Sequence, residues 1–291
     1  MKINTFITSA NNPRFEFMLE EFSKAIGANI VKGEDYKECD VAVIFGSWKD
    51  RNNPWHTVKN RVVKNAKNFI VFETPLIGRG KVEDIMQDDW YRVGLNGFLA
   101  NTGEFNNSNR PSDRWEKIQK ELGVSLKPWR MGGDYIVLAL QIPGDASLRG
   151  TDISDWARRR LLSIRCQTEL PIILRTPQLK RSYDLNSIIR GVRDVTVQQG
   201  TKENLVPTLY GAYCTVTYTS GMGVDSVMNG TPTIAYNPGN FAYDISTRFI
   251  DRIQRLAYPD REQWINNLSY CQWNISEIQE GLPWEHLKEI L

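Results

Sequence analysis

Hydrophobic positions recur along this chain with two spacings, one typical of strands and one typical of helices. In the first third, short continuous apolar runs predict strands, which we place at residues 2–8, 28–31, 40–46, 68–73 and, less regularly, near 91–99. Helical spacing predicts helices at 14–26 and 112–122, and an amphipathic helix between 49 and 67. Apolar strands that alternate with helices are typical of a parallel sheet covered on both faces.

A second series of alternating elements begins after the Pro- and Gly-containing linker 124–133. The predicted strands lie at 134–141, 171–175 and 194–198, and the predicted helices at 152–166, 184–191 and 202–212. The tail after Tyr243 is mostly helical in pattern. The sequence therefore predicts an α/β protein with two Rossmann-like αβα domains facing across a cleft, residues 1–125 and 134–291, with the helical tail in the second domain.

Residues 215–236 form the most informative segment, which reads as a strand, a Ser-Gly-x-Gly turn, a short helix ended by Gly230, and a second strand. Such a turn presents backbone N–H groups at a helix start, where an anion is favoured. Gly221 and Gly223 lack the Cβ atoms that would keep a ligand away, and Asp225 lies within reach of a sugar hydroxyl. The alternative is a βαβ unit with a tight turn and no ligand.

Ligands of open parallel sheets bind at the carboxyl ends of the strands, which selects a set of candidate residues. This set comprises Gly46 and Ser47, Glu73, the segment 141–145, the segment 175–177, and the segment 220–225. It combines a carboxylate from the first domain with basic, hydroxyl and backbone N–H groups from the second.

Charge is concentrated in one region although the formal net charge is only +2. Between Lys49 and Lys67 the chain has six Lys or Arg residues against one acid, on the outer side of the amphipathic helix. Such a surface can follow a phosphate backbone, and the alternative is an ordinary solvated helix face. The candidate nucleic-acid contacts are Lys49, Arg51, Trp55, Lys59 and Lys64.

Several classes of protein are disfavoured by composition. No apolar run approaches the length of a membrane span, and the N-terminus lacks the apolar stretch of a secretory signal. The four cysteines are far apart and lack metal-ligand spacing, so we expect reduced thiols in a cytoplasmic protein and no metal. The two histidines are remote in sequence, which argues against a Ser-His-Asp hydrolase.

Residues 134–284 resemble GT-B glycosyltransferases, especially the Kdo-transferase type of bacterial capsule synthesis. The resemblance rests on Leu138–Asp145 (LALQIPGD), Ile173–Pro177 (ILRTP), Thr219–Pro232 (TSGMGVDSVMNGTP), Asn237–Tyr243 (NPGNFAY) and the tail Leu268–Trp284. It implies that the second domain binds a nucleotide-sugar donor and the first domain binds the acceptor.

Carried over by position, the resemblance implies specific donor contacts. Ser220, Gly221 and Gly223 would receive the phosphates, and Arg175 would balance their charge. Asp225 would hold a ribose or sugar hydroxyl. The remaining donor-binding candidates, within or beside the pocket, are Gln141, Asp145 and Tyr243. A departure is Arg175–Gln178 (RTPQ), which lacks the histidine that this family carries at that strand end.

Glycosyl transfer requires stabilisation of the leaving phosphate and, in an inverting enzyme, a base for the acceptor hydroxyl. Glu73 is the first candidate base, and Arg79 and Asp89 are further catalytic candidates, with Asp88 in reserve. The alternative for Glu73 is a structural carboxylate that caps a helix or pairs with Arg79. The co-substrate is expected to be a UDP-sugar rather than a CMP-sugar, with no metal, and the stereochemistry stays open.

Three hypotheses remain for the biological role. The leading one is transfer to a hydroxymethylated pyrimidine in double-stranded DNA, as in the base-modifying enzymes of T-even-like bacteriophages, in the bacterial host cytoplasm if the protein is phage-encoded. The second is transfer to a saccharide or lipid-linked acceptor of the envelope or capsule. The third is a non-catalytic nucleotide- or DNA-binding protein that keeps the shape of the enzyme.

Overall fold

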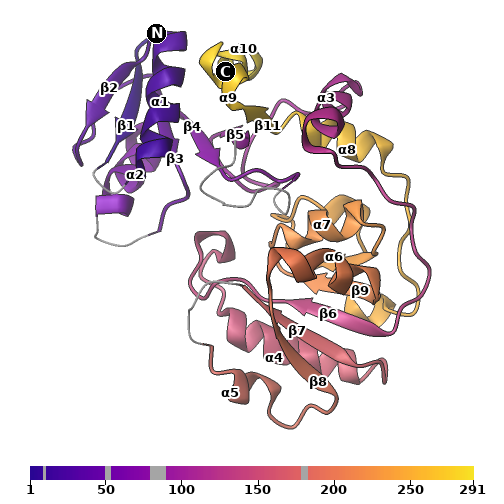
Figure 1. Cartoon of the computed structure of the whole chain (residues 1–291). Helices are drawn as coiled ribbons and strands as arrows, with labels where there is room; N and C mark the ends of the chain where they lie inside the picture. Colours follow the sequence, from indigo (N-terminus) through magenta and orange to yellow (C-terminus); the bar gives the residue numbers. More distant parts are fainter. Residues whose placement is uncertain (9–10, 50–53, 79–89, 178–182) are drawn as a thin grey trace. The chain divides into compact units, whose positions relative to one another are not determined.

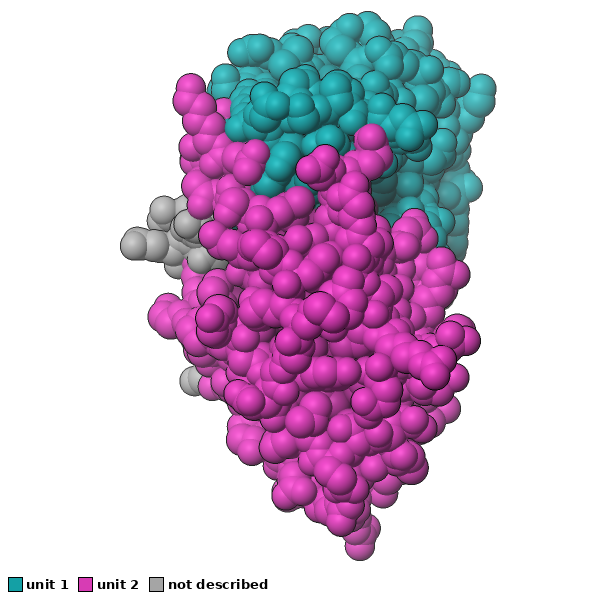
Figure 2. Space-filling view, turned by 90° about the vertical axis from the view of Figure 1, so that its right-hand side faces the viewer, with its two compact units in different colours: residues 1–118, 265–291 teal, residues 119–264 magenta. Residues whose placement is uncertain are grey.

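The computed structural model describes residues 1–8, 11–49, 54–78, 90–177 and 183–291, with the backbone alone at 54 and 55. It divides into two compact units, which Figure 2 colours separately. The first unit comprises Met1–Ile118 and Ile265–Leu291, and the second comprises Gln119–Trp264. Each unit contains its own sheet and its own hydrophobic core.

The first unit is built on a mixed sheet whose described strands run in the spatial order β11-β5-β4-β3-β1-β2. Their bounds are β1 Ile3–Ile7, β2 Asn29–Lys32, β3 Val41–Phe45, β4 Asn68–Glu73, β5 Trp90–Leu95 and β11 Gln272–Asn274. The pairs among β2, β1, β3 and β4 are parallel, as the apolar runs predicted. The pairs β4–β5 and β5–β11 are antiparallel, which the sequence did not predict.

Helices complete the first unit. Their bounds are α1 Pro13–Ile26, α2 Pro54–Asn65, α3 Asp113–Leu122, α8 Glu262–Ser269, α9 Ile275–Gln279, α10 Leu282–Leu287 and the short η5 Lys288–Ile290. The boundaries between the units fall inside α3 and α8. Helix α1 shows why these local patterns succeed: Asn12 caps its first turn, Pro13 begins it, and Gly27 ends it with a φ of 67°.

The tail differs from its predicted place in the second domain. Residues 265–291 belong to the first unit, where β11 pairs with β5 and helix α9 lies beside α1 (Figure 1). Trp273, Ile278 and Trp284 pack with Phe22 in the core of that unit. Burial of these large apolar side chains holds the tail against the first unit. Helical periodicity alone does not reveal such contacts between residues that are distant in sequence.

The second unit contains a sheet whose described strands run in the order β10-β9-β6-β7-β8, with every adjacent pair parallel. Their bounds are β6 Tyr135–Ala139, β7 Ile172–Thr176, β8 Val195–Gln199, β9 Ala212–Thr217 and β10 Thr233–Ala235. The helices are η2 Ala146–Leu148, α4 Ile153–Arg165, α5 Leu185–Ile189, α6 Lys202–Tyr210, α7 Met222–Met228, η3 Tyr243–Ile245 and η4 Ile250–Arg252. The predicted strand–turn–helix–strand order of 215–236 is present as β9, α7 and β10.

Within the described ranges, every helix is too short or too polar to cross a bilayer.

Candidate active site

Glu73 lies at the carboxyl end of β4 in the first unit, and its carboxylate is held by backbone donors. Oε1 accepts a hydrogen bond of 2.7 Å from the N–H of Ser47, and Oε2 accepts one of 3.2 Å from the N–H of Thr74. The guanidinium of Arg92, from β5, lies 4.0 Å from Oε2. A carboxylate has about four acceptor positions, and among the described residues the backbone N–H groups of Ser47 and Thr74 occupy two of them. The side chain is oriented and remains partly exposed.

The turn after β3 is itself braced by a buried lysine. Lys59, in α2, donates from Nζ to the carbonyl oxygens of Phe45 and Ser47, each at 3.1 Å. Between them, Gly46 adopts a φ of 81°, a conformation that favours glycine. Burial lowers the pKa of Lys59 to about 7, and the charge of Glu73 opposes this shift.

The burial of Lys59 corrects the prediction that this residue contacts DNA from an outer helix face. Only 2% of the residue is exposed. It lies three residues before the buried Val62 and one after the buried Val58, on the side of α2 that faces the sheet. Fewer basic side chains are therefore exposed on α2 than the number of Lys and Arg residues between 49 and 67 predicted. Lys64 is exposed in the last turn of α2, and Lys49 is half-buried before the helix.

Some predictions for the first unit fall beyond the described residues. Arg51, Arg79, Asp88 and Asp89 lie outside them, as does the side chain of Trp55. Their predicted roles stay predictions.

In the second unit, Gln141 joins two of the predicted strand-end segments. Its Oε1 accepts the N–H of Thr219 at 2.9 Å, and its Nε2 donates to the hydroxyls of Ser147 and Thr219 at 2.8 and 2.9 Å. Asp145 accepts the N–H and hydroxyl of Ser147 at 2.9 and 2.6 Å and caps η2. These bonds attach the turn after β6 to the residue that precedes Ser220.

The Ser-Gly-x-Gly turn is shaped by a residue that sequence reasoning missed, Asn240. Its Nδ2 donates to the carbonyl oxygens of Tyr218 and Ser220, both at 3.2 Å. A Cβ on Gly223 would lie 2.7 Å from Oδ1 of Asn240. The missing side chain of Gly223 therefore makes room for Asn240, which gives this glycine a structural role, and its predicted contact with the donor phosphates stays a prediction.

Ser220 and Gly221 begin the first turn of α7. The hydroxyl of Ser220 accepts the N–H of Met222 at 3.2 Å, and its carbonyl accepts the N–H of Gly223 at 3.0 Å. The N–H groups of Val224 and Asp225 bond to the carbonyl of Gly221. These backbone N–H groups are therefore already hydrogen-bonded within the turn itself.

Arg175, at the end of β7, is enclosed by its own unit. Nη1 donates to Gln198 and Asn204 side-chain oxygens at 2.7 and 2.6 Å, and Nη2 donates to the carbonyl of Thr201 at 2.9 Å. Burial lowers the pKa of this guanidinium, and Asp225 opposes the shift. The structure thus brings the predicted residues Arg175 and Asp225 close enough to interact electrostatically, and gives Arg175 a bracing role at the start of α6.

Tyr243 begins η3 and is half-buried. The guanidinium of Arg248 lies 4.7 Å from the centre of its ring.

Sequence reasoning did not single out several other residues of these hydrogen-bond networks, among them Thr219, Ser147, Gln198 and Arg92. Asn240 had a signal, because it lies within the Asn237–Tyr243 segment that carried the family resemblance.

Comparison with solved structures identifies the fold. Thermosulfurimonas dismutans KpsC, beta Kdo 2,4 transferase, matches with a TM-score of 0.59 and 14% identity, over 97% of this chain and 98% of that one. Thermosulfurimonas dismutans KpsC, beta Kdo 2,7 transferase, matches with a TM-score of 0.58 and 13% identity, over 98% of this chain and 100% of that one. The fold is GT-B. This confirms the predicted α/β fold class with two Rossmann-like domains, and the likeness in structure extends to the first unit, outside the residues 134–284 that carried the sequence resemblance.

Comparison by sequence gives a different result. No protein-family model matches the chain, and no curated protein matches it.

Proposed function

We propose that this protein is a glycosyltransferase that moves a sugar from a nucleotide-sugar donor to a hydroxyl of a saccharide acceptor. The observation that carries the proposal is the likeness, over nearly the whole chain, to two transferases named for Kdo transfer. Fold alone does not define an activity, so the residues at the strand ends provide separate support. The first unit has an oriented carboxylate at the end of β4, and the second unit has a turn after β9 that Gln141 and Asn240 hold in place.

The second unit is proposed to bind the donor. Ser220 and Gly221 would contact its phosphates, and Asp225 would hold a ribose or sugar hydroxyl. Gln141 and Asp145 would act indirectly, because their hydrogen bonds position the turn after β6 against Thr219. Tyr243 is proposed to line the donor site. Arg175 would contribute its positive charge to this region while holding the start of α6.

The first unit is proposed to supply the base of an inverting reaction. The acceptor oxygen forms a bond to the anomeric carbon while the bond from that carbon to the phosphate oxygen breaks. The acceptor hydroxyl proton passes to the carboxylate of Glu73, and the nucleotide leaves with the electron pair of the broken bond. Glu73 suits this role because the backbone N–H groups of Ser47 and Thr74 hold its carboxylate in one direction, while the side chain stays partly exposed at the strand end.

A hydroxymethylated pyrimidine in DNA is the second candidate acceptor. The observation in its favour is the exposure of the positively charged residues Arg61, Lys64 and Lys67 on and just after α2. Two facts weaken it: Lys59 is buried, and Arg61 pairs with Asp35 at 3.0 Å. Binding through phosphates would make transfer to DNA fall steeply with salt.

One assay separates these functions. Purified protein is incubated with pools of UDP- and CMP-sugars and with either a Kdo-terminated oligosaccharide, hydroxymethylcytosine DNA or hydroxymethyluracil DNA, and the products are weighed by mass spectrometry. We expect a sugar mass on the oligosaccharide. A sugar mass on a modified base instead would select the DNA function. Binding of donor without transfer or hydrolysis would contradict enzymatic function and leave a non-catalytic nucleotide-binding protein.

The base is tested with Glu73→Gln, which should lower the transfer rate by about 10²-fold or more. Glu38→Gln is the matched control, since Glu38 is an exposed carboxylate of the same unit. Retained transfer in Glu73→Gln would contradict the role of Glu73 while leaving the transferase activity intact. The proposal includes no metal, so EDTA should leave the rate unchanged.

A further inference from the structure

Strand β11 of the tail places Gln272 on the same face of the sheet as the candidate base, Glu73. In the sheet of the first unit, Glu73 of β4 is opposite Arg92 of β5, and Arg92 is opposite Gln272 of β11. Directly opposite residues in antiparallel pairs extend to the same face of a sheet. The three polar side chains therefore share one face, although Gln272 is remote from the others in sequence.

Gln272 holds the loop that follows Glu73. Its Oε1 accepts the N–H groups of Leu76 and Ile77 at 3.0 and 2.9 Å, and its Nε2 donates to the carbonyl of Ile77 at 3.4 Å. The side chain is fully buried, so water does not replace these bonds. One glutamine thus fixes two consecutive residues of the loop.

The fixed loop is short enough to affect the carboxylate. Only Thr74 and Pro75 separate Glu73 from Leu76. The ring of Pro75 restricts its φ, and the N–H of Thr74 donates a hydrogen bond to the carboxylate of Glu73. A shift of the loop at Leu76 would therefore displace a group that orients the carboxylate.

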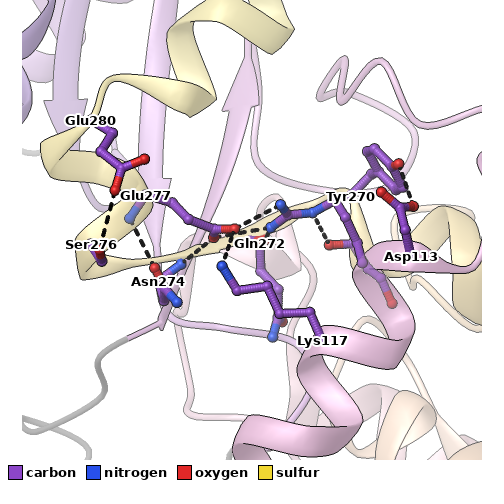
Figure 3. A network of polar contacts seen from close by, with 10 residues as sticks. Asp113, Lys117, Tyr270, Gln272, Asn274, Ser276, Glu277 and Glu280 are labelled. Atoms are coloured by element: carbon purple, nitrogen blue, oxygen red, sulfur yellow. Dashed lines mark hydrogen bonds and ion pairs between the residues drawn. The ribbon is translucent and has the colours of Figure 1, made fainter.

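Gln272 is in turn held by helix α3. Arg114 donates from Nη2 to the carbonyl of Gln272 at 2.6 Å and from Nη1 to Glu277 at 2.9 Å. Figure 3 shows Lys117 directed toward the same carboxylate, which it reaches at 2.8 Å. The guanidinium of Arg114 also lies 3.8 Å from the centre of the Trp273 ring. Arg114 thus anchors β11 at the backbone of Gln272 and at the ring of Trp273, the next residue.

We propose that Gln272 is a positioning residue for the reaction: it fixes the loop after β4 and thereby the direction of the Glu73 carboxylate. This inference rests on the proposed function and deepens it. It makes the tail, which was predicted to belong with the donor domain, a part of the acceptor-side machinery. Misplacement of a reacting group by about 1 Å can lower a rate by about 10²-fold, so a loosened loop should act on kcat.

The test compares three glutamine variants. Gln272→Met removes both acceptor bonds at similar volume, Gln272→Glu keeps the acceptor oxygens, and Gln279→Met changes an exposed glutamine of the same tail. For each we would measure kcat, KM for donor and acceptor, donor hydrolysis, and thermal unfolding. We expect Gln272→Met to lower kcat for transfer by between about 10-fold and 100-fold, with the donor KM unchanged. Gln272→Glu should recover most of this loss, and Gln279→Met should match the wild type.

Two results would overturn the inference. One is a Gln272→Met protein that is folded and has the wild-type kcat. The other is a loss of transfer rate that, in both Gln272→Met and Gln272→Glu, is fully explained by the smaller fraction of folded protein. If Gln272→Met fails to fold, Gln272→Asn gives the same test, because its shorter side chain stays polar but cannot reach both N–H groups. Loss of transfer in Glu73→Gln with none in the Gln272 variants would defeat this inference alone. Absence of transfer in the wild type would defeat the proposed function.

Discussion

The backbone N–H of Ser47 donates a 2.7 Å hydrogen bond to Oε1 of Glu73, linking the end of β3 to the end of β4. The hydrogen-bond donor is a backbone N–H group, so the identity of the serine side chain should matter little. Ser47→Ala should retain transfer, whereas Ser47→Pro, which has no N–H, should lower kcat by about 10-fold or more. Steady-state kinetics of the two variants check this, with circular dichroism to confirm that both fold. Equal rates would show that this bond does not orient the carboxylate.

Lys59 should make stability depend on pH. Its pKa is about 7 in the folded protein and about 10.4 in an unfolded chain. Between these values the unfolded chain binds more protons at this residue, so the contribution to the free energy of unfolding rises with pH. Below about pH 7 both states are protonated, and the penalty for burying the charge stays constant.

The measurement is urea unfolding at pH 7 and pH 9. From the lower to the higher pH, the free energy of unfolding of the wild type should gain about 2 kcal/mol relative to Lys59→Met. Lys64→Met, which changes an exposed lysine of the same helix, should keep the wild-type dependence. If the wild type and Lys59→Met change in parallel, Lys59 does not lose its proton in this range.

Gly223 and Asn240 should be coupled. A Cβ at position 223 would lie within 3.0 Å of both terminal atoms of Asn240, so Gly223→Ala should destabilise by about 1–3 kcal/mol. In an Asn240→Ala background the same change should cost less, because the clashing side chain is gone. A double-mutant cycle of unfolding free energies measures the difference. If the two free-energy changes are strictly additive, the side chain of Asn240 is not what clashes with a Cβ at position 223.

Arg175 should contribute more to stability than to donor affinity. Arg175→Met removes the bonds to Gln198, Asn204 and Thr201 and should cost about 3 kcal/mol of unfolding free energy. Arg193→Met is the control, because Arg193 pairs with Glu169 at the surface and should cost at most about 1 kcal/mol. A large increase in donor KM for Arg175→Met, with little loss of stability, would favour direct contact with the phosphates.

Local patterns in the chain were enough to predict most of its elements. Strand β4 was predicted at its observed bounds, and α1 was predicted to begin one residue late and to end where it does, because apolar runs and helix caps act over a few neighbouring residues. The order β9-α7-β10 and the place of Glu73 at a strand end were also predicted, since both follow from where short segments begin and end.

Contacts between distant segments decided the rest. A lysine on a basic helix was interpreted as exposed, and only the packing of α2 showed that Lys59 is buried. The tail was predicted as helices of the second domain, but pairing of β11 with β5 placed it in the first unit. The same pairing brings Gln272 to the loop after Glu73. The sequence by itself determined the local elements and their chemistry, while tertiary structure decided which residues meet, because hydrogen bonds and burial depend on proximity in space and not on spacing in the chain.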